Sequence, residues 1–336
     1  MTFMMKYWET DDWTERYAFA QRQAITGLVF GEIEKSANNN SNMPKQLLFQ
    51  WLGDAERIKQ QNFRINQEVE ALSHLLEVNG VTFAVVKGQV VATYYERPEL
   101  RSSGDIDFFV PSEDVEKAHM LICKEWGVEM EKGDSPYHFH FEHNGITFEM
   151  HYRLFLFYQQ RKINYWENVL HQAIGYKVTI GSTNVATIEP TVHALYVFLH
   201  LYHHLVEVGV GLRQFCDLAM LLKEDIDRDA LMKHMKALGM ERAFRACGYI
   251  LTEYLGMDKK YLPFEIDAKD RKYGLRMLDV VLYRGNMGHY NKKNGWSGIG
   301  HQVESACIKI AHFAKFFWLS PGYHLGWMKE RLLFHG

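Results

Sequence analysis

The chain has 336 residues, 47% hydrophobic and 24% charged, so it can bury an ordinary core and divide into two or three regions. Lysine and arginine total 38 against 41 for aspartate and glutamate, and the net charge of −3 argues against a long nucleic-acid partner. The four cysteines form no Cys-x-x-Cys pair, which is typical of reduced thiols. Without a signal-peptide core or a stretch of roughly 18 apolar residues, we expect a soluble cytoplasmic protein with no transmembrane segment.

Helical and strand patterns occupy different parts of the chain. Helical periodicity covers residues 13–35 and 45–78, and the polar segment 36–44 separates them. Strand patterns concentrate between residues 81 and 188, and Pro190 opens a second helical part. The predicted fold class is α+β, with a mixed β-sheet core flanked by helical regions. The predicted regions are an N-terminal helical region at 1–79, the core at 80–188 and a C-terminal helical domain at 189–336.

A strand-to-helix turn opens the core. The apolar run at residues 83–86 predicts a buried strand, and Lys87-Gly88 joins it to a helical stretch from Gln89 to Glu96. Glycine at such a turn places free backbone N–H groups, the positive end of a helix dipole and a lysine at one point. We therefore predict that this turn holds phosphate. The alternative is a surface lysine at a strand end.

The next strand carries two carboxylates. Asp105 and Asp107 are one residue apart in an apolar run, so both point to one face of a strand. Two carboxylates on a half-buried strand repel each other, and the arrangement makes sense mainly when a cation lies between them. Mg²⁺ is the natural candidate. The alternative is a solvated Asp-x-Asp at a strand end. A helix is predicted next, from Pro111-Ser112 to Gly127.

A hairpin follows, and its register can be predicted. Residues 137–143 and 146–152 flank Asn144-Gly145, the preferred pair for a two-residue type I′ turn. One face then pairs large apolar side chains and belongs to the core. The polar face pairs Glu142 with Thr147, His140 with Glu149, and His138 with His151.

These motifs resemble the nucleotidyltransferase superfamily, most closely an uncharacterised branch with a Lys-Gly motif and an Arg-x-x-Gly-Asp-x-Asp motif. The general superfamily has Gly-Ser in place of Lys-Gly and usually a shorter gap to the acidic pair. The likeness extends over most of the chain and implies a nucleotidyltransferase-like sheet. The residues that carry it are Lys87-Gly88, Arg101, Gly104-Asp105-Ile106-Asp107 and Phe148-Glu149-Met150-His151.

The resemblance implies a metal site of three carboxylates. It places the hairpin beside the Asp-x-Asp strand, so that Glu149 joins Asp105 and Asp107 as catalytic residues that bind Mg²⁺ or Mn²⁺. His140 and His151 are the expected partners that support these ligands.

The resemblance also implies a nucleotide triphosphate site. Lys87, Gly88, Gly104 and Arg101 are the expected phosphate contacts. For Arg101, a structural ion pair with one of the acidic residues is an equal alternative.

The implied activity is metal-dependent transfer of a nucleoside monophosphate from a nucleotide triphosphate, with ATP expected, to a hydroxyl or phosphate group and release of pyrophosphate. A small-molecule acceptor is favoured. Two alternatives stay open: transfer to a protein or a tRNA end, as in toxin-like members, and a non-catalytic nucleotide-binding scaffold. Acceptor, nucleotide preference and oligomeric state are encoded by no motif.

Four histidines near the hairpin suggest zinc as an alternative metal. Strand alternation argues against it, because His143 falls on the opposite face from His138 and His140, and no His-Glu-x-x-His motif is present.

The C-terminal half adds weaker signals. His200 and His204 fall near one helix face, and Arg213 and Asp217 have the spacing of an i,i+4 surface pair. The resemblance suggests instead that this helical region closes over the cleft, so that His200, His204 or Asp217 contacts nucleotide or acceptor. The glycine-rich segment 284–300 lacks the P-loop pattern and predicts a mobile loop.

The last part of the chain, residues 308–334, is aromatic and basic. We expect it to pack on its own domain as an amphipathic helix rather than on a membrane surface.

Overall fold

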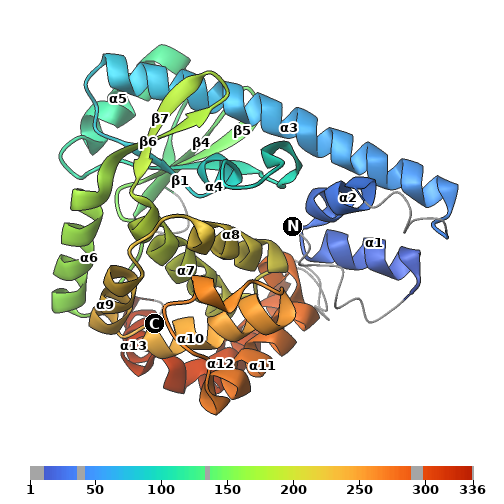
Figure 1. Cartoon of the computed structure of the whole chain (residues 1–336). Coiled ribbons are helices and arrows are strands. Elements are labelled where there is room, and N and C mark those ends of the chain that lie inside the picture. The colour runs from blue at the N-terminus through green and yellow to red at the C-terminus, as the bar shows by residue number, and fades with distance from the viewer. Residues whose placement is uncertain (1–10, 36–41, 133–136, 289–297, 335–336) are drawn as a thin grey trace.

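The structure, a computed structural model, describes residues 11–35, 42–132, 137–288 and 298–334. It confirms the α+β class: a mixed five-stranded sheet lies between a long helix and a group of helices formed by the C-terminal half of the chain (Figure 1). Along the described part of the chain, no helix has both the length and the apolar character needed to cross a membrane.

The N-terminal region forms three helices, and the longest runs along one side of the sheet (Figure 1). The continuous helix predicted over 13–35 is interrupted at Gln23. Its buried side chain explains the break, because it accepts a hydrogen bond from the Leu212 N–H at 3.0 Å and donates one to the Val281 carbonyl at 3.2 Å. The helices are α1 (Trp13–Arg22), α2 (Thr26–Lys35) and α3 (Lys45–Val78).

The central sheet is mixed because one of its pairings is parallel. β2 and β5 run parallel, and the other neighbours run antiparallel. A separate two-stranded ribbon consists of β6 (Ile174–Ile180) and β7 (Thr183–Ile188). In spatial order the strands of the central sheet are β1 (Ala84–Val86), β2 (Asp105–Phe109), β5 (Ile146–His151), β4 (His138–His143) and β3 (Glu131–Lys132).

The β4–β5 hairpin has the predicted turn and register. Asn144 and Gly145 have φ values of 50° and 71°, as a type I′ turn requires. His140 faces Glu149, and His138 faces His151. The short turn therefore determines which side chains the hairpin presents to the polar face.

The connecting helices differ from the prediction at two ends. α4 ends at Ala92 instead of Glu96. α5 begins at Val115, because Pro111 to Asp114 forms a turn closed by the Asp114 N–H and the Pro111 carbonyl at 2.9 Å. It ends at Gly127 as predicted, with a left-handed φ of 66°. These elements are α4 (Gly88–Ala92), a 3₁₀ turn (Pro98–Leu100), α5 (Val115–Trp126) and α6 (Gln160–Ala173).

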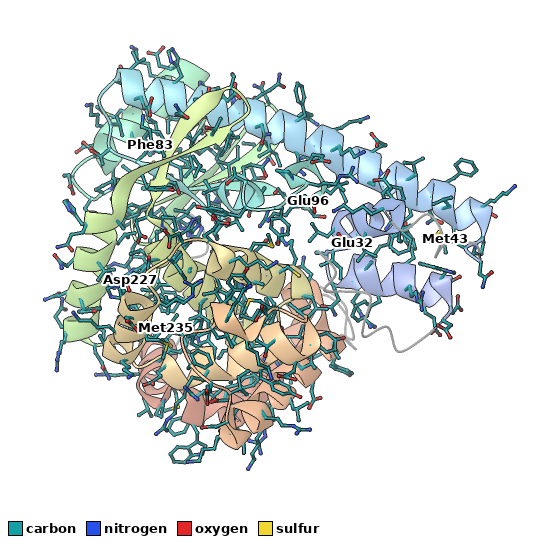
Figure 2. The ribbon with its side chains drawn as sticks, in the orientation of Figure 1. Glu32, Met43, Phe83, Glu96, Asp227 and Met235 are labelled. Carbon is teal, nitrogen blue, oxygen red and sulfur yellow. The ribbon has the colours of Figure 1, made fainter. Side chains whose placement is uncertain are left out.

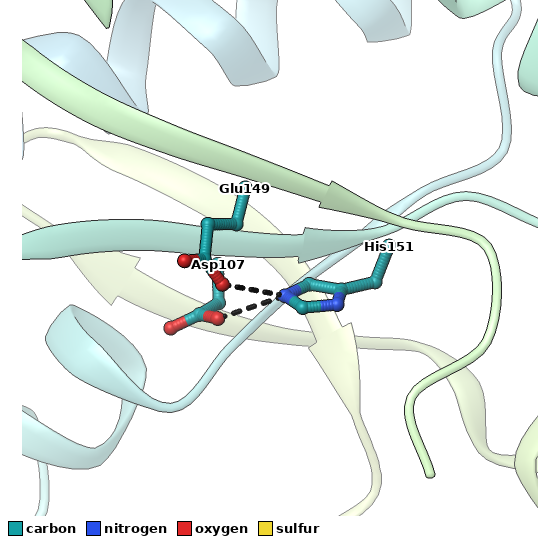
Figure 3. Close-up of side chains that lie close together, drawn as sticks. All are labelled: Asp107, Glu149 and His151. Atoms are coloured by element: carbon teal, nitrogen blue, oxygen red, sulfur yellow. Dashed lines mark hydrogen bonds and ion pairs between the residues drawn. The ribbon is translucent and has the colours of Figure 1, made fainter. Parts of the chain in front are cut away.

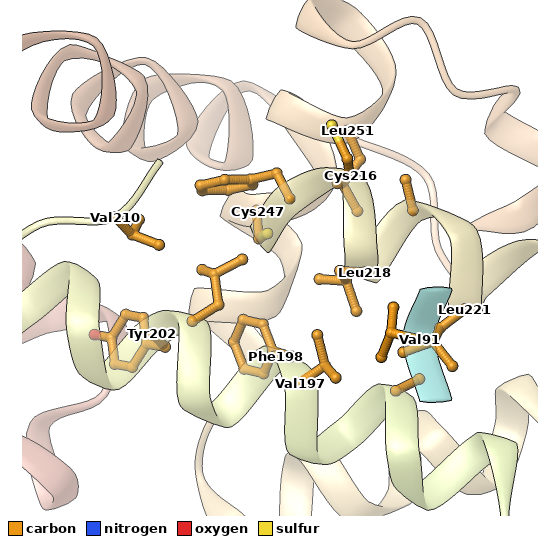
Figure 4. Packing of buried hydrophobic residues seen from close by; sticks show 14 of the residues in the cluster. Val91, Val197, Phe198, Tyr202, Val210, Cys216, Leu218, Leu221, Cys247 and Leu251 are labelled. Carbon is orange, nitrogen blue, oxygen red and sulfur yellow. The ribbon is translucent and has the colours of Figure 1, made fainter. Parts of the chain in front are cut away.

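Apolar packing places the C-terminal helices against the sheet region. Phe198 of α7 and Leu218 of α8 belong to one buried cluster with Val91 of α4 (Figure 4). Met235 of α9 is fully buried in the same cluster (Figure 2). The helices are α7 (Pro190–Glu207), α8 (Leu212–Lys223), α9 (Arg228–Leu238), α10 (Glu241–Tyr249), α11 (Ala268–Arg284), α12 (Gly298–Phe316) and α13 (Pro321–Phe334).

A second cluster fills the space between α3 and the sheet. Val69 and Leu72 of α3 lie in it together with Ile106 and Phe108 of β2 and Phe148 of β5. The apolar side chains of β2 and β5 therefore face α3, and the alternating polar ones face away from it.

The aromatic C-terminal segment packs on its own domain, as predicted. Tyr323 is buried, and its hydroxyl lies 2.7 Å from Nδ1 of His203 on α7. The indole N–H of Trp327 donates to Glu207 at 2.7 Å. Of the predicted glycine-rich loop, residues 289–297 lie outside the described residues.

Candidate functional site

The polar face of the sheet gathers two carboxylates and an imidazole (Figure 3). Asp107 of β2 is the direct parallel-register neighbour of Glu149 on β5, and His151 follows two residues later on the same face. Their oxygen and nitrogen atoms lie within 4.8 Å of one another. The prediction that the hairpin lies beside the Asp-x-Asp strand is therefore confirmed.

His151 bridges the two carboxylates. Its Nε2 is 2.9 Å from Asp107 Oδ1 and 3.2 Å from Glu149 Oε2. Burial works to lower the pKa of His151, but the hydrogen bonds to Asp107 and Glu149 raise it above the usual value. In this arrangement the Nε2–H of the imidazole is the hydrogen-bond donor and the two carboxylates are the acceptors.

Lys87 supplies a second positive charge to Asp107. Its Nζ lies 2.6 Å from Asp107 Oδ1, and only 3% of the Asp107 side chain is exposed. Burial works to raise the pKa of Asp107, but the charge of Lys87 and the hydrogen bond from His151 hold it below the usual range. The carboxylate is therefore ionised and paired.

The backbone of Lys87 is strained to bring its side chain here. Its φ is 56°, a left-handed value that non-glycine residues rarely adopt. Its N–H donates to Nε2 of His193 at 3.2 Å. The predicted phosphate site at this turn needs an ammonium and a backbone N–H without partners in the protein. Both groups of Lys87 have such partners, Asp107 and His193. Gly88 begins the short helix α4 directly after it.

Asp105 lies at the start of β2, on the same face as Asp107, and its side chain is exposed. The charge of Asp107 raises the pKa of Asp105 above the usual value. Asp105 is outside the group formed by Asp107, Glu149 and His151. Its role as a metal ligand remains a prediction.

Helix α7 contributes side chains around Lys87. Tyr196 is 1% exposed, and its hydroxyl is hydrogen bonded to the Lys87 ammonium. Burial, followed by the charge of Lys87, lowers the pKa of His200 well below the usual value. The His200 and His204 ring centroids are 4.3 Å apart. These neutral histidines extend the site on the side of α7.

Arg101 and Asp217 form a buried ion pair, so the expected Arg213–Asp217 surface pair is wrong. Arg101 Nε and Nη2 donate to the two Asp217 oxygens, each at 2.8 Å. The Tyr95 hydroxyl donates to the same carboxylate at 2.8 Å. Burial works to raise the pKa of Asp217, but Arg101 holds it below the usual value. The structural alternative for Arg101 is the one found.

Arg213 was not singled out as a site residue by the sequence. Its Nη1 donates to the Ser102 carbonyl at 2.6 Å, in the segment that leads into β2. Only its spacing from Asp217 was visible in the sequence, and that spacing suggested a solvent-exposed pair.

The other hairpin histidines take different positions. His140 faces Glu149 across the hairpin as predicted, while its Nε2 lies 3.6 Å from Glu131. His143 points to the opposite face and contacts Glu68 at 2.7 Å. Strand alternation therefore separates His143 from the group of Asp107, Glu149 and His151, so the four hairpin histidines do not gather at one metal position.

The donor set suits a divalent ion. Asp107 and Glu149 converge from neighbouring strands, and carboxylate oxygens are the ligands that Mg²⁺ and Mn²⁺ prefer. Lys87 and His151 provide the positive charge at these carboxylates in the structure as it stands.

A family model agrees with the motifs. The model of a family described as uncharacterised nucleotidyltransferase matches residues 9–256. No curated protein matches the chain in sequence. A similar solved structure is that of an antigenic nucleotidyltransferase-like protein from Paracoccidioides brasiliensis. It is 13% identical, covers 57% of this chain and 92% of its own, and superposes with a TM-score of 0.40.

Proposed function

The chain belongs to the family of uncharacterised nucleotidyltransferases, and on that premise we propose that it transfers a nucleoside monophosphate from ATP to a hydroxyl or phosphate group of a small molecule, releasing pyrophosphate. The observation that carries the proposal is the convergence of Asp107 and Glu149 on one face of adjacent parallel strands. A nucleotidyl transfer needs this pattern, because charge on the phosphates must be neutralised where the bonds change.

Asp107 and Glu149 would hold Mg²⁺ or Mn²⁺, which would neutralise phosphate charge and orient the attacking oxygen. Asp105 extends the same face toward solvent and is the proposed third carboxylate. Glu149 would accept the proton of the acceptor hydroxyl, a role supported by its greater exposure than that of Asp107. Lys87 and His151 fix the orientation of the Asp107 carboxylate.

The burial of the site supports a small acceptor. Asp107 and Tyr196 are almost fully enclosed, and α7 supplies side chains on the side of Lys87. A sugar or an alcohol is small enough to approach such buried groups more closely than a protein side chain or a tRNA end.

The test is an assay of label transfer. The purified chain is incubated with each of the four α-³²P-labelled nucleotides, Mg²⁺, and a set of sugars, sugar phosphates and alcohols, and pyrophosphate release is followed in parallel. We expect release with ATP and transfer of label to one acceptor class. Asp107→Asn should lower the rate by roughly a hundredfold or more.

Glu142→Gln is the matched control, because Glu142 is an exposed carboxylate on the neighbouring strand of the same hairpin. It should retain the wild-type rate. Absence of pyrophosphate release with every nucleotide, or equal rates in Asp107→Asn and wild type, would contradict the proposal.

A further inference from the structure

Three cationic side chains lie around the entrance to β2, and two of them already have carboxylate partners. The Lys87 ammonium is 2.6 Å from Asp107, and the Arg101 guanidinium binds both oxygens of Asp217. Both cations are strongly buried. The two residues that the sequence assigned to phosphate are therefore engaged by the protein itself.

Arg213 is the third cation, and it has no such partner. Its guanidinium donates only to the Ser102 carbonyl, and among the described residues no carboxylate forms an ion pair with it. Its Nε is buried without a hydrogen-bond partner. Asp217, four residues away on α8, is already bound by Arg101 through both oxygens. The residue as a whole is partly exposed.

This arrangement leaves the Arg213 guanidinium close to the acidic strand with a backbone carbonyl as its hydrogen-bond acceptor. Asp217 is hydrogen bonded by Arg101 and not by Arg213, and the charge of Arg101 is, after burial, the second cause that lowers the pKa of Arg213. The hydrogen bond from Arg213 to the Ser102 carbonyl places its guanidinium beside the segment that leads into β2. An anion bound there would give the Arg213 guanidinium a direct hydrogen-bonded partner of opposite charge.

The segment before β2 has room for such an anion. Ser102 and Ser103 are partly exposed and Gly104 is exposed, with no atom within 4 Å of where its Cβ would be. A guanidinium presents donors in a fork that matches two phosphate oxygens. The open segment 102–104 therefore connects the place where the Arg213 guanidinium donates to the exposed carboxylate of Asp105.

We infer that Arg213, and not Lys87 or Arg101, is the side chain that binds the polyphosphate of the nucleotide, at the Ser102–Gly104 segment. This inference rests on the proposed function and extends it. The phosphates then lie between the carboxylates of the sheet and the N-terminal part of α8. Lys87 orients Asp107, and Arg101 fixes the segment to Asp217, without contacting phosphate themselves.

Calorimetric titration with Mg²⁺ and inorganic tripolyphosphate tests the inference, with Arg213→Gln compared with wild type. Losing one charged, forked contact should weaken binding roughly ten- to hundredfold. Arg213→Lys keeps the charge and loses the forked donor geometry, so its affinity for tripolyphosphate should lie between those of wild type and Arg213→Gln. It replaces Arg213→Gln in the comparison if that variant does not fold. Arg64→Gln is the matched control, because Arg64 also donates from one terminal nitrogen to one backbone carbonyl, that of Asn144 at 3.0 Å.

Two further arms separate the outcomes. Tripolyphosphate should compete with ATP; binding without competition would place the anion on the acceptor side and overturn the inference. Unchanged tripolyphosphate affinity in Arg213→Gln and Arg213→Lys would also overturn it. If ATP binding then still depended on Asp107, the proposed function would stand while the Arg213 assignment failed. If no nucleotide reacts but tripolyphosphate binding depends on Arg213, the proposed function fails and the anion site remains.

Discussion

Arg101, three residues before Gly104 in the segment that leads into β2, and Asp217, on α8, form a two-point ion pair with both N–O distances at 2.8 Å. The pair joins the acidic strand to the C-terminal helices. Because both side chains are buried, removing one leaves an unpaired charge without water around it.

We therefore predict that Asp217→Asn lowers the free energy of unfolding by about 3–5 kcal/mol. Denaturant unfolding measures the change. Glu125→Gln is the control, because the Lys124–Glu125 pair is exposed and should contribute less than about 1 kcal/mol. The double variant Arg101→Met/Asp217→Leu should be more stable than Asp217→Asn, since neither charge of this pair remains; a double variant that is less stable would contradict this account.

The ammonium of Lys87 occupies a carboxylate oxygen that a divalent ion would use. We predict that Lys87→Met binds Mn²⁺ several-fold more tightly than wild type in the absence of nucleotide, because the lysine no longer competes for Asp107. Titration followed by the electron paramagnetic resonance of free Mn²⁺ measures this. Mn²⁺ should also raise the melting temperature more in Lys87→Met than in wild type. Weaker Mn²⁺ binding in the variant would contradict this prediction and show that the orientation of Asp107 by Lys87 outweighs its competition for the carboxylate oxygen.

The type I′ turn of the β4–β5 hairpin sets the position of Glu149. Gly145→Ala should lower the free energy of unfolding by about 1–2 kcal/mol, because alanine is strained at a φ of 71°. Gly53→Ala is the control with the opposite expected sign. Gly53 lies inside α3 with open space at its Cβ, and alanine there should stabilise the protein by about 0.5–1 kcal/mol. Thermal or urea unfolding distinguishes the two, and equal effects would contradict the turn argument.

Buried neutral histidines make the protein sensitive to acid. Burial lowers the pKa of His193 to about 3, far below about 6.5 in an unfolded chain. Between these values the unfolded chain binds a proton that the folded chain does not, so stability falls as pH falls through this window. His193→Gln should make stability less steep with pH between about 6.5 and 4. His171 is exposed, so His171→Gln is the control. An unchanged slope of stability against pH in His193→Gln would show that His193 is not a source of the acid sensitivity.

The parts of the site that could be predicted from the sequence depend on local rules. Alternation put Asp105 and Asp107 on one face of β2, and the Asn144-Gly145 turn determined the hairpin register, so Glu149 could be assigned once the resemblance placed the hairpin beside β2. The helix over 45–78 was predicted with the bounds found, because its apolar periodicity is long and uninterrupted.

The parts that could not be predicted depend on contacts between distant segments. Arg101 and Asp217 are 116 positions apart, and nothing local distinguishes Asp217 as the partner of Arg101 from Asp217 as the partner of Arg213. The strained backbone of Lys87 and the break of the first helix at Gln23 likewise depend on α7, α8 and α11. Tertiary contacts overrode the local pattern at each of these points.

The measurement that tests the central claim most directly is calorimetric titration of ATP with Mg²⁺ into wild type, Asp107→Asn and Glu149→Gln, with Glu142→Gln as control. The account predicts Mg²⁺-dependent binding in wild type and Glu142→Gln, and weaker or absent binding in the other two, because their carboxylates converge on one face of β2 and β5. Binding that ignores both Mg²⁺ and the loss of Asp107 and Glu149 would contradict it.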